Sequence, residues 1–266
     1  MIKNHYLYTD YSTHKKMEKR VVVKLQGAGI YHAENPNVTL TPRTREKAGE
    51  KVLEEINLEI CAGEVVYLIG RVGSGKSSLL KTLYGELPLV EGMGEIAGFD
   101  LTRIKQSKLP YLRRKVAMVF QELILLSDRN AHDNLLVALQ ATGWSNKRAI
   151  EERIDEVLKL VGLEGKGEKM PFELSGGERQ RLVIARTLLN SPDVILADEP
   201  TVNLDPVTAD GIVRLFHEIA AKGTAVVMST HNTSLIENYP STTLLFAHKA
   251  VHSVDINELI STKSSI

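Results

Sequence analysis

The sequence predicts an α/β fold with a core of buried strands, and three observations predict it. Apolar runs of strand length occupy residues 65–69, 194–197 and 225–228. After the first two runs come helix-start residues and then apolar side chains at helical spacing. Residues 56–60 alternate apolar and polar side chains, as in a strand with one buried face. We therefore expect a mainly parallel core and a separate antiparallel β layer.

The composition indicates one compact domain without a bulk electrostatic attraction for nucleic acid. The 266 residues are 43% hydrophobic, and 33 Lys and Arg balance 33 Asp and Glu. A single cysteine, Cys61, fits a reducing compartment. No apolar run approaches the roughly 20 residues that span a bilayer, and we find no secretion signal. Membrane association would therefore need a partner.

The N-terminal part of the chain is expected to supply β structure after a flexible tail. Residues 1–20 are polar and form the predicted tail, and the first strand begins at Val21. Tyr31 ends that strand region, where its ring either stacks on a purine base or packs at a sheet edge. Residues 34–51 are polar and contain proline, which predicts a surface insertion.

A Gly-rich run, Gly70-Arg71-Val72-Gly73-Ser74-Gly75-Lys76-Ser77, directly follows the first apolar strand. Its pattern, G-x-x-x-x-G-K-S, predicts a loop whose backbone N–H groups and helix N-terminus bind a phosphate chain. Lys76 would reach the β- and γ-phosphates, and the Ser77 hydroxyl would bind Mg²⁺. Glycine is expected at positions 73 and 75 because a Cβ would obstruct the loop or its backbone angles.

The next strand, predicted over 116–120, ends at Gln121, at the sheet edge where α/β folds place ligands. A neutral amide there can contact a metal and a water. The apolar run Leu123 to Leu126 follows, and it belongs either to a helical core or to a groove for another protein's helix. Ala131 to Val161 is predicted to be helical, with Gly162 at its end.

A second anion-binding turn is predicted at Leu174-Ser175-Gly176-Gly177-Glu178. Ser175 and Glu178 form a capping box, which by itself indicates only a well-capped helix. Glycine disfavours a helix, however, so a cap alone does not explain two adjacent glycines. Bare N–H groups at a helix N-terminus attract anions, which favours an anion site here.

Acidic residues and a histidine follow the last two buried strands. Asp198 and Glu199 end one strand and suit Mg²⁺ binding and activation of water. Asp205 and Pro206 are the expected cap and first residue of the next helix. His231 follows the strand at 225–228; a lone histidine is usually structural, but its place beside the phosphate site favours a functional role.

These motifs, in this order, resemble the ATP-binding cassette ATPases over about Val21 to Val254, which implies a P-loop NTPase (RecA-like) core with an antiparallel β layer and an inserted α-helical subdomain. We expect this nucleotide-binding domain at 21–260 and its helical subdomain at about 122–180. Within the class, the segments 109–114 and 119–121 most resemble the cell-division ATPases of the FtsE type. The lipoprotein-releasing and macrolide-exporter ATPases are close relatives.

The resemblance implies a role for each motif. Glu199 would be the catalytic base, with His231 and Gln121 completing the catalytic geometry. Ser77, Gln121 and Asp198 would hold Mg²⁺. The residues expected to bind ATP are Tyr31, Gly70, Gly73, Ser74, Gly75, Lys76, Ser77, Ser78, Ser175, Gly176, Gly177 and Asp205.

The resemblance also implies partners. ATP would lie between two copies of the chain, each giving its signature turn at Ser175 to Gly177 to the other copy's Gly-rich loop. The homodimer would drive an integral membrane FtsX-like subunit from the cytoplasmic face of the inner membrane, without nucleic acid. An exporter ATPase is the alternative function. The segment between Lys76 and Ser175 is too short for the long coiled coil of chromosome-organising ATPases.

Four residues, at three places, depart from the family pattern: Val202 replaces a small residue before Asn203, Asn232 replaces the usual Asp after the histidine, and His248-Lys249 replaces a turn that is usually Asp-Gly. None of these changes removes a catalytic group.

Overall fold

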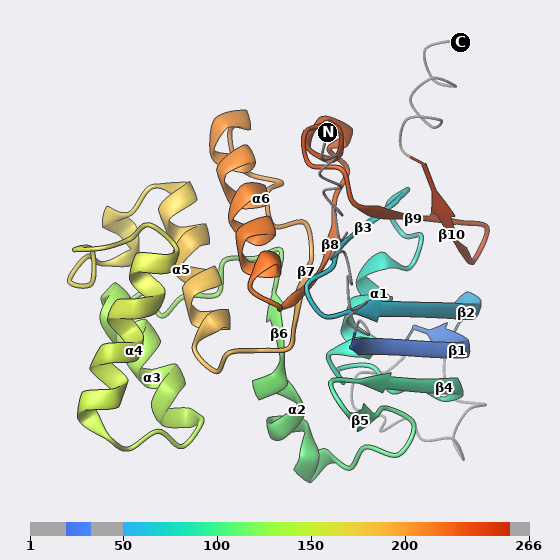
Figure 1. Ribbon diagram of the computed structural model, residues 1–266, viewed down its shortest axis with the longest axis horizontal. Helices are drawn as coiled ribbons and strands as arrows, with labels where there is room; N and C mark the ends of the chain where they lie inside the picture. The colour runs from blue at the N-terminus through green and yellow to red at the C-terminus, as the bar shows by residue number, and fades with distance from the viewer. Residues whose placement is uncertain (1–19, 33–49, 256–266) are drawn as a thin grey trace, which may run out of the picture.

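The computed structural model describes residues 20–32 and 50–255. The predicted tail up to residue 19, and residues 34–49 of the predicted insertion, lie outside the described residues. The described residues form two sheets and a group of helices (Figure 1). Among them, no helix is both long enough and apolar enough to cross a membrane.

The larger sheet confirms the predicted parallel core. Its strand order is β10-β9-β3-β8-β7-β6; every pair is parallel except β10 with β9. The bounds are β3 Val65–Gly70, β6 Val116–Val119, β7 Val194–Ala197, β8 Ala225–Ser229, β9 Thr242–Ala247 and β10 Ala250–Val254. Strands β6, β7 and β8 are buried throughout, which explains why their sequences are apolar runs.

The smaller sheet is the expected antiparallel layer. It has the order β2-β1-β4-β5, with bounds β1 Val21–Tyr31, β2 Lys51–Cys61, β4 Glu91–Ile96 and β5 Phe99–Asp100. In β2, Ile56 and Ile60 are buried while Asn57 and Glu59 are exposed. The alternation read from the sequence therefore has one face on the core.

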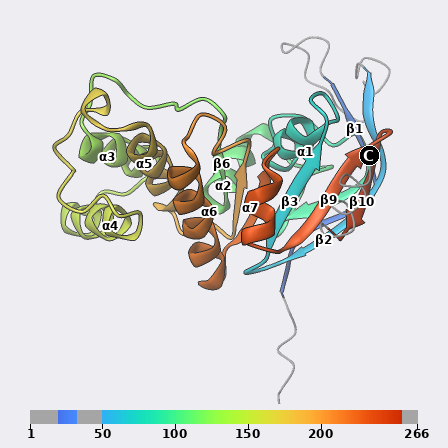
Figure 2. The same ribbon diagram turned by 90° about the horizontal axis from the view of Figure 1, so that it is seen from above.

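Helices cover the parallel sheet and extend away from it (Figure 2). They are α1 Lys76–Leu83, α2 Leu109–Lys115, α3 Ala131–Ala141, α4 Lys147–Leu160, α5 Gly176–Leu188, α6 Pro206–Ala221 and α7 Thr233–Asn238. Alternate residues of β3 lie in two different apolar clusters: Tyr67 packs with residues of α5 and α6, and Leu68 packs with α1 and the antiparallel layer. Both faces of the parallel sheet are thus buried.

The predicted helix over Ala131 to Val161 was wrong in one respect, because it is two helices. Between them, Gly143 adopts φ +91°, a conformation that glycine accepts without steric cost. Asn146 then starts α4 as its N-cap, its side chain accepting from the Ala149 N–H. The apolar face of α4 that the sequence indicated is buried against α3 and α5.

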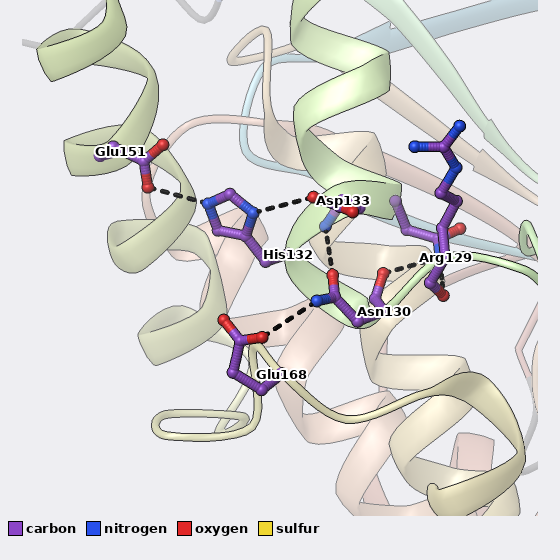
Figure 3. A network of polar contacts seen from close by, with 7 residues as sticks. Arg129, Asn130, His132, Asp133, Glu151 and Glu168 are labelled. Carbon is purple, nitrogen blue, oxygen red and sulfur yellow. Dashed lines mark hydrogen bonds and ion pairs between the residues drawn. The ribbon is translucent and has the colours of Figure 1, made fainter.

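Polar contacts tie α3 to its neighbours (Figure 3). The His132 ring lies between Asp133 and Glu151, with Nε2 2.8 Å from Glu151 Oε2 and Nδ1 3.4 Å from Asp133 Oδ1. Asn130, the N-cap of α3, donates to Glu168 in the loop before the signature turn. The start of α3 is therefore linked to α4 and to that loop.

Candidate nucleotide-hydrolysis site

The Gly-rich loop joins β3 to α1, as predicted, and curls around the Lys76 side chain. Lys76 is 6% exposed and donates from Nζ to the carbonyl oxygens of Gly70, at 2.9 Å, and Arg71, at 3.1 Å. Burial lowers the pKa of Lys76, while the carboxylates of Glu199 and Asp198 act in the opposite direction. The Lys76 amine therefore lies near Asp198 and Glu199, which the sequence also predicts to act on the nucleotide.

The loop glycines have measurable reasons to be glycine. Gly73 has φ +79° and Gly75 has φ +101°, which L side chains rarely adopt. A Cβ on Gly75 would also lie 2.8 Å from Leu53 Cγ, and one on Gly70 would lie 2.5 Å from the Phe246 carbonyl oxygen. The loop conformation therefore depends on these positions.

The serines of the loop differ in their surroundings. Ser74 Oγ is buried and has no hydrogen-bond partner among the described residues. Ser77 is exposed at the first turn of α1, and the neighbouring Ser78 is buried. An unpartnered hydroxyl and a helix N-terminus without a side-chain cap both leave hydrogen-bonding capacity at this loop, which fits an anionic ligand.

Asp198 and Glu199 share one support, the hydroxyl of Ser229 at the end of β8. Ser229 Oγ donates to Asp198 Oδ1 at 2.7 Å and accepts from the Glu199 N–H at 2.8 Å. Glu199 itself has φ +49°, a strained conformation for a side chain of its size. Sequence reasoning missed Ser229; a serine at the end of an otherwise apolar strand was the available signal.

Glu199 and His231 are in direct contact, with His231 Nε2 2.8 Å from Glu199 Oε1. Both residues line a hollow of about 450 Å³ together with Val202 and Asn232. His231 also borders a larger cavity of about 710 Å³, whose walls include residues 70–74 of the Gly-rich loop. His231 thus lies between the Gly-rich loop and the acidic pair, Asp198 and Glu199.

The predicted signature turn has the expected cap. Glu178 accepts from the Ser175 N–H at 2.8 Å, and Ser175 Oγ accepts from the Glu178 N–H at 3.3 Å. The second oxygen of Glu178 pairs with Lys166, which lowers the pKa of this carboxyl together with the backbone hydrogen bond. Lys166 was not singled out from the sequence.

The structure supplies a packing reason for one of the two glycines. A Cβ on Gly177 would lie 2.3 Å from Thr208 Cγ2 in α6, whereas the nearest atom to a Cβ on Gly176 is Leu204 Cδ2 at 3.8 Å. Exposure of N–H groups to an anion is therefore not the only reason for glycine in this turn. For Gly177, contact with Thr208 already requires glycine.

The signature turn does not share an element with the Gly-rich loop. In both views α5 belongs to the helical group on the left, while α1 lies on the other side of β6 (Figures 1 and 2). The acidic pair and His231 gather with the Gly-rich loop; Ser175 to Gly177 are on the helical side.

The remaining predicted site residues have their own contacts. Tyr31 donates its hydroxyl to Glu91 Oε2 at 2.7 Å, and the Lys51 amine lies 5.9 Å from its ring centroid. Gln121 is exposed just beyond β6. Asp205 caps α6, accepting from the Val207 and Thr208 N–H groups. The capping role of Asp205 is confirmed; contact of these three residues with ATP stays a prediction.

The departures from the family pattern sit at the surface of the site. Val202 is 50% exposed beside Glu199, and Asn232 caps α7 by accepting from the Leu235 N–H. His248 and Lys249 both have positive φ, +51° and +61°, in the turn between β9 and β10. The predicted late hairpin turn is confirmed, although neither residue is the glycine that such angles favour.

Comparison with known proteins agrees with this geometry. The profile of the ABC transporter family matches residues 53–202. The cell division ATP-binding protein FtsE of Streptococcus pneumoniae is 42% identical over 188 residues, covering 71% of this chain and 81% of that protein. FtsE of Escherichia coli K12 is 41% identical over 202 residues, covering 75% and 90%. A dimeric ATP-binding cassette solved in a post-hydrolysis state with ADP and Pi superposes with a TM-score of 0.72, at 28% identity, over 88% of this chain and 98% of its own. The chain therefore belongs to the ABC transporter ATPases, as an ATP-hydrolysing, FtsE-like ATP-binding protein.

Proposed function

We propose that this protein is the ATPase of an FtsEX-like complex, in which ATP binding and hydrolysis change the shape of an integral membrane partner that regulates cell-wall hydrolysis during division. The single observation that carries the enzymatic part is the Glu199–His231 contact beside the phosphate loop. The division assignment is supported by relatives that bear the cell-division name and that this chain matches over most of its length. The names of these relatives do not favour the alternative, an exporter ATPase.

The residues present fit a triphosphate with its magnesium ion. Asp198 is 8% exposed; Oδ1 accepts from Ser229, and Oδ2 has no hydrogen bond within the described part of the chain. Asp198 and the exposed Ser77 hydroxyl would hold Mg²⁺, with Gln121 contributing its amide. Bound there, the ion would neutralise phosphate charge as the terminal phosphoryl group leaves.

In the reaction itself, the chain's own residues position and deprotonate water. Lys76 Nζ would exchange its bonds to the Gly70 and Arg71 carbonyls for the β- and γ-phosphate oxygens. The Glu199 carboxylate would accept a hydrogen bond from the attacking water and polarise it. His231, already in contact with Glu199, would donate from its ring to the γ-phosphate and hold the base in place.

The second half of the site would come from another copy of the chain. Ser175, Gly176 and Gly177 lie on the helical side of this copy, and their N–H groups begin α5. A helix N-terminus whose N-cap is a serine suits binding of the γ-phosphate of the nucleotide that the other copy holds. We therefore propose a head-to-tail homodimer that closes on ATP and opens after hydrolysis, which would deliver a mechanical stroke.

The location follows from the partner. We place the protein at the cytoplasmic face of the inner membrane, held by an FtsX-like subunit. The test is affinity capture of the tagged protein from detergent-solubilised membranes. Recovery of a membrane subunit with four spanning helices is the expected result. Recovery of an import system with a periplasmic binding protein would overturn the division assignment.

A further inference from the structure

A surface of cations without carboxylate partners surrounds α2. Between Asp100 and Glu122 the chain carries six basic residues and no acidic one, although the whole chain has no net charge. Arg103 and Lys115 are within 4.0 Å of a carboxylate. The other four, in the part of the chain that the structure describes, have none; we call them the α2 cations, namely Lys105, Lys108, Arg113 and Arg114.

Three of the α2 cations lie over aromatic rings instead of beside carboxylates. Lys108 Nζ and Arg114 Cζ each lie 5.3 Å from the centroid of Tyr111, which is 52% exposed. Arg113 Cζ lies 4.8 Å from the centroid of Tyr84. A cation over a ring keeps its charge and its outer donors, because the ring offers no acceptor oxygen. The positive charge of this surface is therefore available to an outside anion.

The α2 cations also occupy a defined place in the fold. Helix α2 lies below β6 and beside the antiparallel layer in Figure 1, and Leu112 is its only buried residue. Through Tyr84 the cluster reaches Phe120, because the two rings meet edge to face at 5.9 Å, and Phe120 directly precedes Gln121. The α2 cations are thus joined by packed rings to the segment of Gln121, the residue predicted to contact the nucleotide.

We infer that the α2 cations bind the anionic headgroup layer of a membrane. This inference rests on the proposed location of the protein at a membrane. Several separate phosphate groups in one plane can each meet a different cation of an exposed 3₁₀ turn and short helix, and this match of charge is why we favour lipid over a single small anion. The attraction adds to the hold of the membrane partner, since a polybasic surface alone gives modest affinity.

The test is co-sedimentation of the purified full-length protein with vesicles of equal parts phosphatidylglycerol and phosphatidylcholine, and with vesicles of phosphatidylcholine alone. We expect binding to the anionic vesicles only, weakened by added salt. Replacement of three cations, Lys105→Gln, Lys108→Gln and Arg113→Gln, should weaken binding by about a hundredfold, since each cation near an anionic surface contributes about fivefold.

A matched control removes the same charge elsewhere. Lys147→Gln, Lys159→Gln and Lys222→Gln neutralise three exposed lysines on or beside α4 and α6, and this variant should bind anionic vesicles as the unchanged protein does. ATP hydrolysis in both triple variants should match the unchanged protein, which shows that they fold.

Three results would overturn the inference: no binding to anionic vesicles, equal binding to neutral vesicles, or equal weakening by both triple variants. A fourth pattern would assign the α2 cations to an acidic protein segment instead. In that pattern the unchanged protein does not bind anionic vesicles, and the triple variant of the α2 cations no longer captures the membrane subunit. If the protein binds anionic vesicles but affinity capture recovers no membrane subunit, the result would count against the proposed function and not against lipid binding by the α2 cations.

Discussion

His231 Nε2 lies 2.8 Å from Oε1 of Glu199, so the side chains that follow two neighbouring parallel strands, β8 and β7, are in direct contact. The carboxylate is thereby fixed from its side chain by His231 and from its backbone by Ser229. If Glu199 is the proposed base, a carboxylate held at both ends has little freedom to turn away from a bound water.

Replacing Glu199, the proposed base, should separate ATP binding from hydrolysis. Glu199→Gln keeps the size of the side chain and the contact to His231 but removes the proton acceptor. We expect ATP to bind normally while turnover falls at least roughly a hundredfold, measured by phosphate release and by nucleotide titration. Glu218→Gln, on the exposed side of α6, is the control and should leave turnover unchanged. Turnover near normal in Glu199→Gln would remove Glu199 from its assigned role.

His231 should act through the hydrogen bond that its ring is proposed to donate to the γ-phosphate. His231→Ala is expected to lower kcat by about tenfold to a hundredfold, the loss expected for one hydrogen bond to a charged group, with little change in KM. His231→Gln retains an N–H donor of similar reach and should recover part of the loss. Equal rates for the alanine and glutamine variants would show that the ring matters for packing and not for donation.

The contact between Gly177 and Thr208 predicts a rescue. Gly177→Ala places a methyl group 2.3 Å from Thr208 Cγ2, and overpacking of this kind costs about 1–3 kcal/mol of unfolding free energy. Adding Thr208→Ser removes Cγ2 but keeps the hydroxyl that bonds Asp205, so the double variant should regain the loss in urea unfolding. Gly176→Ala, with its nearest neighbour at 3.8 Å, is the control and should not destabilise the protein. A Gly177→Ala variant as stable as this control would contradict the packing argument.

The His132 contacts predict a pH-dependent contribution to stability. Burial lowers the pKa of His132, but the side-chain hydrogen bonds to Glu151 and Asp133 outweigh it, so the pKa is raised from its usual 6.5. A raised pKa means that the folded protein binds the proton more tightly than the unfolded chain does. The stabilisation is therefore complete below pH 6.5 and is lost as the pH rises through the folded-state pKa.

The measurement is the difference in unfolding free energy between the unchanged protein and His132→Gln at a series of pH values. The difference should be largest in mild acid and shrink toward pH 8. His252→Gln is the control, because His252 is exposed on β10. A difference that stays constant over this range, or grows with pH, would contradict the assignment.

Local chemistry in the sequence was sufficient for much of the fold. The caps at Ser175 and Asp205 depend on neighbours a few residues away, and both are confirmed. The strands of the parallel core could be predicted because burial on both faces makes their sequences continuously apolar. The alternating pattern of β2 likewise predicted its half-buried face.

What the sequence did not predict depends on distant contacts or on a local balance. The Gly177–Thr208 contact and the Ser229 bridge join segments far apart in the chain, and no periodicity encodes them. The break between α3 and α4 was missed because the apolar spacing on both sides of Gly143 is helical, and one glycine inside such a pattern is often tolerated.

One hydroxyl group holds both acidic residues, and this limits how the site can be altered. Removing it in Ser229→Ala would loosen the proposed metal ligand and the proposed base together, so such a variant could never tell the two tasks apart. Any redesign that aims to keep the cation while slowing water attack must leave this serine in place and begin at the carboxylate of Glu199.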